Sequence, residues 1–204
     1  KAGRPRWWVI GLSSFLALVV GVVLWLVLRD EAYVAPPPGP AARQIQPAPA
    51  AALLQDLTLA VREGDHAAAA ALAATGNDGA TDQLRSLVSN ADAIGLRGVG
   101  LRYVDELGGI DREGTWSASA TLTWRFGSID RGLATTEVRV DFTVADGVVG
   151  IAGLGGDGEV PTAQPIWFAD PVEVRRTAET LVVAADGVDA YAPLASRAVR
   201  VVRR

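Results

Sequence analysis

Residues 116–126, WSASATLTWRF, decide the fold of this 204-residue chain. Every second position from Trp116 to Phe126 carries an aromatic, aliphatic or alanine side chain, and the positions between them carry hydroxyls and one arginine. Because successive side chains of a β-strand point to opposite faces, this alternation predicts a long antiparallel strand with one buried and one polar face.

The same alternation continues on both sides of this strand. Residues 99–103 alternate before it, and residues 134–144 alternate after it. Asp146-Gly147 is the dipeptide typical of a two-residue β-hairpin, and residues 148–154 then return as a fourth strand. We therefore expect a sheet built from neighbouring antiparallel strands.

Amphipathic helices are expected ahead of the strands. Apolar residues recur at helical spacing over 53–63 and 80–94, and a short alanine-rich helix that runs to Ala74 is expected between them. Asp65 can cap the second helix, and Gly95 can end the third. Each apolar face must cover something, so the pattern predicts an α+β fold in which helices pack on an antiparallel sheet.

The charges of the chain are unevenly distributed. The formal net charge of −4 is made up of +3 before residue 7 and −7 from Arg29 onward. The 22 residues between them, 7–28, contain no charge and no proline, and at about 1.5 Å per residue they span roughly 33 Å, enough for a bilayer core. We interpret this segment as a permanent transmembrane helix, since a cleaved signal peptide would have a shorter apolar core.

The basic flank 1–6 predicts the orientation of this helix. Positive residues stay in the cytoplasm, so the bulk of the chain is expected to be extracytoplasmic, on a single-pass anchor in the cell membrane. Ser13, Ala17 and Gly21 are spaced by four and form a small-residue stripe. The stripe could pack against a second helix, or its residues could simply face lipid.

Composition divides the rest of the chain. Residues 29–50 contain six of the 11 prolines among alanine and glycine, which is typical of an extended linker. Residues 51–160 are expected to form the α+β domain. Residues 161–204 are expected to form a short β-hairpin and a helix from Asp189, the start of a truncated further domain.

Composition also limits the chemistry. The chain has no Cys, no Met and one His, His66, which excludes disulfides, thiol nucleophiles and a multi-histidine metal centre. The missing Met at position 1 predicts that the sequence does not begin at a native start codon. A pI near 5.0 argues against nucleic acid as a partner. Gly153, Gly155 and Gly158 match a dinucleotide-binding pattern, but prolines follow where such a site needs a helix.

Four side chains are candidates for lining a pocket: Tyr103, Asp105, Trp116 and Trp124. An isomerase pocket needs a carboxylate base and an acidic hydrogen-bond donor, for which Asp105 and Tyr103 are the candidates. However, Asp105 stands beside Glu106 near a glycine turn, which indicates an exposed strand end, and the aromatic residues could be plain core. We therefore expect no catalytic residue, cofactor or metal site in this chain.

The helices and the long strands with aromatic inward positions resemble the NTF2-like cone over residues 51 to about 154. The resemblance implies a curved sheet packed on helices. NTF2-like domains include enzymes such as ketosteroid isomerase and many non-catalytic modules, so the resemblance alone does not choose a function.

The C-terminal segment carries a second resemblance. Residues 165–186, PIWFADPVEVRRTAETLVVAAD, and 189–204, DAYAPLASRAVRVVRR, resemble a junction in a group of single-pass membrane proteins of high-GC Gram-positive bacteria. In that group an anchor, a Pro/Ala linker and an NTF2-like segment precede a zinc-metallopeptidase-like domain with a His-Glu-x-x-His motif. This sequence has no such motif, so no peptidase residue can be carried over to it.

These observations predict a membrane-anchored, extracytoplasmic NTF2-like module with a structural or interaction role, which presents a downstream domain absent from this chain. The alternative is an accessory subunit of a cell-envelope transport or secretion complex, and a small-molecule or isomerase-like pocket is the third candidate. The expected partners are the lipid bilayer and either other envelope proteins or the downstream domain.

Overall fold

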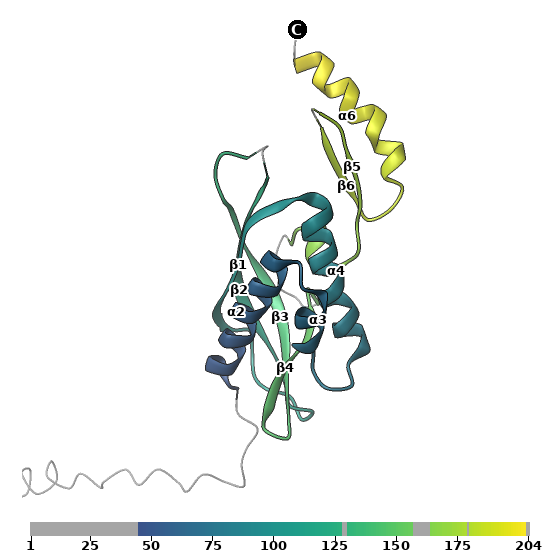
Figure 1. Ribbon diagram of the computed structural model, residues 1–204. Coiled ribbons are helices and arrows are strands. Elements are labelled where there is room, and N and C mark those ends of the chain that lie inside the picture. The colour runs from purple at the N-terminus through teal and green to yellow at the C-terminus, as the bar shows by residue number, and fades with distance from the viewer. Residues whose placement is uncertain (1–44, 128–129, 157–163, 179, 203–204) are drawn as a thin grey trace, which may run out of the picture. The chain divides into compact units, whose positions relative to one another are not determined.

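The computed structural model describes residues 45–127, 130–156, 164–178 and 180–202 (Figure 1). The expected basic flank, the transmembrane segment 7–28 with Ser13, Ala17 and Gly21, and most of the expected linker lie outside the described residues. Within the described ranges, no helix is both long and apolar enough to span a bilayer. Residues 43–204 belong to one compact unit.

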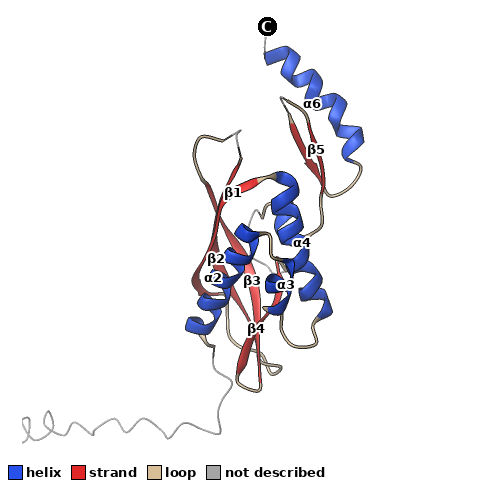
Figure 2. Cartoon of the chain, in the orientation of Figure 1, coloured by secondary structure: helices blue, strands red, loops and turns tan. Residues whose placement is uncertain are grey.

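The described residues form a mixed α+β fold, with helices first and an antiparallel sheet after them (Figure 2). The first helices are α2 (Pro47–Glu63), α3 (His66–Ala71) and α4 (Asp78–Ile94). The sheet pairs its antiparallel strands in chain order: β1 (Leu96–Glu106), β2 (Thr115–Phe126), β3 (Ala134–Ala145) and β4 (Val148–Leu154). The chain continues through α5 (Ile166–Ala169), the hairpin of β5 (Glu173–Arg176) and β6 (Leu181–Ala184), and α6 (Val188–Val202). The expected α+β class and strand order are confirmed.

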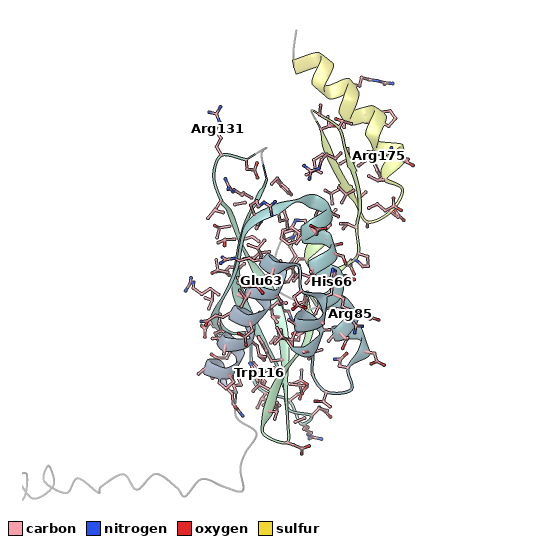
Figure 3. The ribbon with its side chains drawn as sticks, in the orientation of Figure 1. Glu63, His66, Arg85, Trp116, Arg131 and Arg175 are labelled. Carbon is pink, nitrogen blue, oxygen red and sulfur yellow. The ribbon has the colours of Figure 1, made fainter. Side chains whose placement is uncertain are left out.

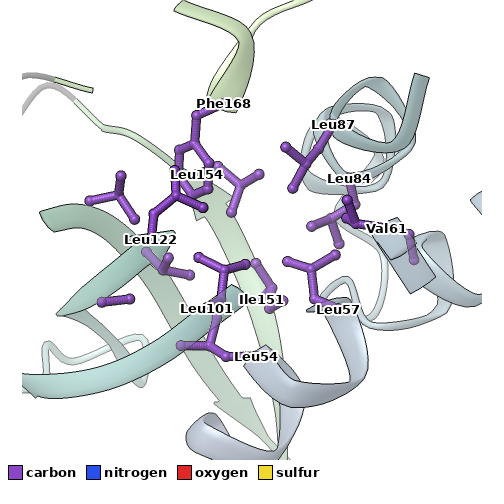
Figure 4. Packing of buried hydrophobic residues seen from close by; sticks show 14 of the residues in the cluster. Leu54, Leu57, Val61, Leu84, Leu87, Leu101, Leu122, Ile151, Leu154 and Phe168 are labelled. Atoms are coloured by element: carbon purple, nitrogen blue, oxygen red, sulfur yellow. The ribbon is translucent and has the colours of Figure 1, made fainter. Parts of the chain in front are cut away.

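The main core lies between the helices and one face of the sheet (Figure 4). Leu54 and Leu57 of α2 and Leu84 and Leu87 of α4 are almost completely buried there, as the helical spacing of apolar residues predicts. The strands supply the facing side chains, which include Leu101, Leu122, Phe142, Ile151 and Leu154.

The burial of β2 follows its sequence alternation. Trp116, Ala118, Ala120 and Leu122 are all buried on the helix-facing side. The pairing of β1 with β2 shifts register twice, which marks β-bulges that bend a strand and give the sheet its curvature.

The hairpin between β3 and β4 has the expected turn. Asp146 and Gly147 have φ values of 51° and 80°, so both central residues adopt the positive φ that a type I′ turn requires. The dipeptide therefore fixes the register of β4, because the turn leaves Ala145 paired with Val148.

The helix ends also follow local sequence signals. The Asp65 carboxylate accepts hydrogen bonds from the backbone N–H groups of Ala67 (3.0 Å) and Ala68 (2.8 Å), which caps α3 as expected. Gly64 and Gly95 both have a φ of 72°, the left-handed conformation that ends a helix.

Two helix boundaries differ from the sequence prediction. The first helix begins at Pro47, inside the expected linker 29–50, because proline is well tolerated in the first helical turn and Ala50 is fully buried in the core. The second helix ends at Ala71 and not at residue 74, because Ala74 donates its N–H to the carbonyl of Ile151 in β4 (2.8 Å).

Helix side chains occupy the backbone groups at both edges of the sheet. At the β1 edge, Thr58 Oγ1 accepts from Leu101 N (2.9 Å) and Arg62 Nε donates to Val99 O (2.6 Å). Both side chains come from α2, so part of the β1 edge is covered by the helix and is not available to an added strand.

The β4 edge is covered in the same way by the chain around α4. Asn77 Nδ2 donates to Ala152 O (2.9 Å), and the Gln83 amide oxygen accepts from Leu154 N (3.0 Å). Asn77 also caps α4 by accepting from Ala80 N (2.9 Å). The two amides thus fill positions that a fifth strand would otherwise take.

Gly150 in β4 lies against this edge cover, and we expect the substitution Gly150→Ala to lower stability. A Cβ at this position would lie 2.6 Å from Ala74 Cα and 2.9 Å from Ala74 N, so the backbone must move. Overpacking of this kind costs about 1–3 kcal/mol, measurable by urea unfolding.

Gly109→Ala is the matched control, because a Cβ there meets nothing within 4 Å. It should change the free energy of unfolding by less than about 0.5 kcal/mol. Equal effects of the two substitutions would show that the contact with residue 74 is unimportant.

Candidate functional site

The four candidate pocket residues do not come together. Trp116 and Trp124 share one face of β2 but lie eight residues apart, which is roughly 27 Å along a strand. Figure 3 shows Trp116 toward one end of the sheet and Arg131, in the connection after β2, at the other. The expected pocket therefore divides into two separate aromatic groups.

Around Trp116 the aromatic residues are core. The Trp116 side chain is 2% exposed and stacks on Phe142, with ring centroids 5.5 Å apart. The half-buried Tyr103 ring lies 6.2 Å from Phe142. The alternative that the aromatic residues are plain core thus describes this end of the sheet.

Asp105 lies on the other face of the sheet from Tyr103. Tyr103 pairs with Ala120, but after the register shift Asp105 pairs with Ser119, on the polar side of β2. Paired residues share a face, so the bulge turns the Asp105 carboxylate away from the aromatic side. Asp105 is exposed and accepts from Glu106 N (2.9 Å). The proposed base and donor are therefore not arranged for an isomerase reaction.

Tyr103 has a distinctive acid–base environment. Its hydroxyl donates to Glu106 Oε1 at 3.2 Å. Burial raises the pKa of Tyr103 from 10.0 to about 12, and the negative charge of Glu106 adds to the rise.

We expect an ultraviolet titration to show one tyrosine ionising near pH 12 and this step to disappear in Tyr103→Phe. The folded state holds the proton more tightly than the unfolded state, so the stabilising contribution is complete below pH 10 and is lost as the pH rises through 12. Removing the neighbouring charge with Glu106→Gln should lower the pKa of Tyr103. An unchanged value would contradict the electrostatic part of this explanation.

The second aromatic group forms an apolar recess at the other end of β2. The rings of Trp124 and Trp167 meet edge to face, with centroids 5.5 Å apart and an interplanar angle of 75°. The recess has a volume of about 510 Å³. It is lined by Trp124, Phe126, Thr136, Gln164, Pro165, Ile166, Trp167 and Val183.

The walls of this recess contain two unpaired polar atoms. Trp124 Nε1 and Gln164 Oε1 are two of the three buried side-chain polar atoms that have no hydrogen-bond partner among the described residues; the third is Trp116 Nε1. Such atoms are rare in folded proteins and cost stability, so each needs an explanation. Of the four candidate pocket residues, Trp124 lines the recess.

Asn90 holds the recess wall and the C-terminal segment to α4. Its side-chain amide is 4% exposed and donates from Nδ2 to the carbonyls of Trp167 (2.8 Å) and Asp170 (2.7 Å). Its Oδ1 accepts from Val172 N (3.1 Å). One buried amide thus fixes three backbone groups of the segment that leads into β5.

Asn90 is not among the residues predicted from the sequence, although its position on α4 carries a signal. Asn90 follows Leu87 by three residues and precedes Ile94 by four, so it lies on the buried stripe of its helix. A polar residue on such a stripe must have partners inside the protein, which marks it as a structural anchor.

Further contacts join the C-terminal hairpin to α4 and to α6. The Arg176 guanidinium donates to the carbonyl of Ile94 in the last turn of α4. Glu173 Oε2 accepts from Val188 N at the start of α6 (2.9 Å), and Arg175 forms an ion pair with Asp189. The hairpin expected from the sequence is confirmed, and the helix expected from Asp189 begins at Val188.

The single histidine and the glycines of the dinucleotide-like pattern take no part in these contacts. His66 is exposed in the first turn of α3, and Gly153 lies within β4, while Gly158 is outside the described residues. The next described helix after β4 begins only at Ile166. Within the described ranges, no three carboxylate or imidazole groups gather in a way that could hold a metal ion.

The chain matches no protein-family model and no curated protein. A solved chain named Rd1NTF2_05, carrying five substitutions, is similar at 14% sequence identity and a TM-score of 0.37. The likeness covers 52% of this chain and 94% of that one.

Proposed function

We propose that the chain is an extracytoplasmic NTF2-like module with a structural or interaction role, tethered to the cell membrane by residues 7–28. Its α+β body would hold the unit formed by β5, β6 and α6 in a fixed place. The main observation in support is that the buried Asn90 amide makes three hydrogen bonds to backbone groups of the segment 167–172. We further propose that the module presents a downstream domain of the same polypeptide.

Support for the NTF2-like assignment comes from the element order. Within the part of the chain that the structure describes, three helices precede a curved sheet of four antiparallel strands, and these helices cover one of its faces. Support for the tether comes from the uncharged segment 7–28 and its basic flank. Support for a structural role comes from the register of β1, which places Asp105 and Tyr103 on opposite faces of the sheet, so that the candidate isomerase pair does not share one face.

A spin-label distance measurement tests the fixed attachment. The chain has no native cysteine, so Leu59→Cys on α2 and Leu194→Cys on α6, both exposed positions, would be the two labelled sites. We expect a single narrow distance distribution, which Asn90→Leu should broaden. Ser89→Ala, on the exposed side of α4, is the control and should leave it narrow. A broad distance distribution in the chain that carries only the two labelled cysteines would refute the fixed attachment.

A topology experiment tests the tether. The full chain with a C-terminal tag should remain in the membrane pellet after carbonate extraction. External protease should cleave the tag in spheroplasts but not in inverted vesicles, because the bulk of the chain is expected outside the cytoplasm. Recovery in the carbonate supernatant, or the reverse pattern of cleavage, would contradict the proposal.

A further inference from the structure

We propose that the recess beside Trp124 and Trp167 is a binding site for a small, neutral, apolar molecule. This inference does not depend on the membrane tether or on the presentation of another domain. It rests on the size of the recess, the chemistry of its walls and the elements from which the walls come.

The size of the recess suits a small organic ligand. Its volume of about 510 Å³ lies within the range of roughly 300–1,000 Å³ that is usual for ligand pockets. Three aromatic rings, those of Trp124, Phe126 and Trp167, contribute to its walls. Aromatic walls offer large apolar contact areas and edge-to-face positions for a further ring.

The chemistry of the walls selects for a neutral ligand. None of the described residues that line the recess carries a charge, and the polar residues among them are Thr136, Gln164 and Trp124. A charged molecule would lose its hydration here without gaining an ion pair, which is unfavourable. We therefore expect these described walls to favour a neutral ligand over a charged one.

The unpaired atoms Trp124 Nε1 and Gln164 Oε1 do not face the open space of the recess. Both are covered by neighbouring atoms in the structure, so a ligand would reach them only after a side-chain rotation. The expected affinity comes from apolar contact, and these two atoms would add selectivity for ligands with one hydrogen-bond acceptor and one donor.

The mouth of the recess is marked by Ile166. This side chain is 51% exposed, whereas the next residue along the one-turn helix α5, Trp167, is buried. Ile166 can therefore be changed without disturbing the core, which makes it the position at which to test access to the recess.

The walls come from the sheet and from the C-terminal unit. Trp124 and Thr136 belong to β2 and β3, whereas Val183 belongs to β6. A ligand in the recess would contact both parts at once and stabilise their attachment. Ligand binding and the position of the hairpin are therefore expected to be coupled.

The test uses two fluorescent probes that differ by one charged group, N-phenyl-1-naphthylamine and its 8-sulfonate. Residues 43–204 are the suitable chain, because they form one compact unit that holds the whole described core and because apolar probes dissolve in lipid. We expect saturable binding of one molecule of the neutral probe per chain. The sulfonate should bind at least about tenfold more weakly, since its charge must be desolvated.

Variants locate the binding. Ile166→Asp places a charge at the mouth and should weaken binding of the neutral probe about tenfold or more. Val148→Asp makes the same kind of change at an exposed position in the distant β3–β4 hairpin and should leave binding unchanged. Thr136→Phe fills the recess from β3 and should also reduce binding.

Three outcomes would overturn the proposal. One is equal binding of the neutral probe by Ile166→Asp and the unsubstituted chain. Another is equal affinity for the two probes, or binding that does not saturate, which would indicate general apolar surface. The third is a concentration-dependent dimer that Ile166→Asp abolishes and that excludes the neutral probe, which would show that a second copy occupies the recess.

Discussion

Replacing Asn90 by leucine is expected to lower the free energy of unfolding by about 2–4 kcal/mol, although the two side chains are similar in size. Leucine fits the apolar stripe of α4 but makes none of the three hydrogen bonds to Trp167, Asp170 and Val172. The carbonyls and the N–H would remain in a buried place without their partner. Urea unfolding measures the loss, and hydrogen exchange of the Val172 amide measures the local opening.

Two further substitutions separate the hydrogen bonds from other effects. Ser89→Ala changes the neighbouring exposed residue of the same helix and should alter stability by less than about 0.5 kcal/mol. Asn90→Asp keeps an oxygen that can accept from Val172 N–H. It replaces the donating amide with a carboxylate, which cannot donate to the carbonyls of Trp167 and Asp170. Its loss of stability should diminish in acid, where the protonated carboxyl can donate. No difference between Asn90→Leu and Ser89→Ala would show that the amide contributes nothing.

Replacing Phe142 by alanine is expected to have the largest effect on the stability of the sheet, a loss of about 3–5 kcal/mol. Phe142 is completely buried and contacts the ring of Trp116 on β2 and the ring of Tyr103 on β1. The substitution would remove both ring contacts and leave a cavity that these strands cannot easily close. Urea unfolding measures this loss as a lower midpoint concentration, and the dependence of the free energy of unfolding on urea concentration should not change.

Val148→Ala is the control for this substitution. Val148 is exposed in the same pair of strands, so the loss of its methyl groups should change stability by less than about 0.5 kcal/mol. The near-ultraviolet circular dichroism of Trp116 should change in the Phe142 variant only, because the two rings are stacked. A loss below about 1 kcal/mol in Phe142→Ala would contradict the central place of this ring.

The fold was predictable where local chemistry determines structure. The alternation around Trp116, the positive φ required at Gly147 and the cap at Asp65 each depend on residues close in sequence. The start of α2 was not predictable in this way, because Pro47 suits both an extended linker and a first helical turn. Only the burial of Ala50 against the rest of the chain decides between them.

The site was less predictable because it depends on contacts between distant residues. Trp124 was a candidate from its place on β2, but its partner Trp167 lies 43 positions later, beyond the sheet. The displacement of Asp105 depends on a bulge that the alternation of β1 does not reveal. Asn90 could have been found from its position on an apolar stripe, whereas its three backbone partners could not.

The covered edges of the sheet have a consequence for synthesis on the ribosome. The residues that cover β1 and β4 belong to α2, α4 and the turn before α4, all of which precede the strands in the chain. Translation at about 5–20 residues per second therefore delivers Asn77 and Gln83 several seconds before the strand whose edge they fill. The residues that cover each edge have therefore been synthesised before the edge strand itself, which shortens the time in which nascent strands can pair with another chain. A circular permutant that begins at β1 would reverse this order, and its nascent chains should aggregate more during translation although the folded structure is the same.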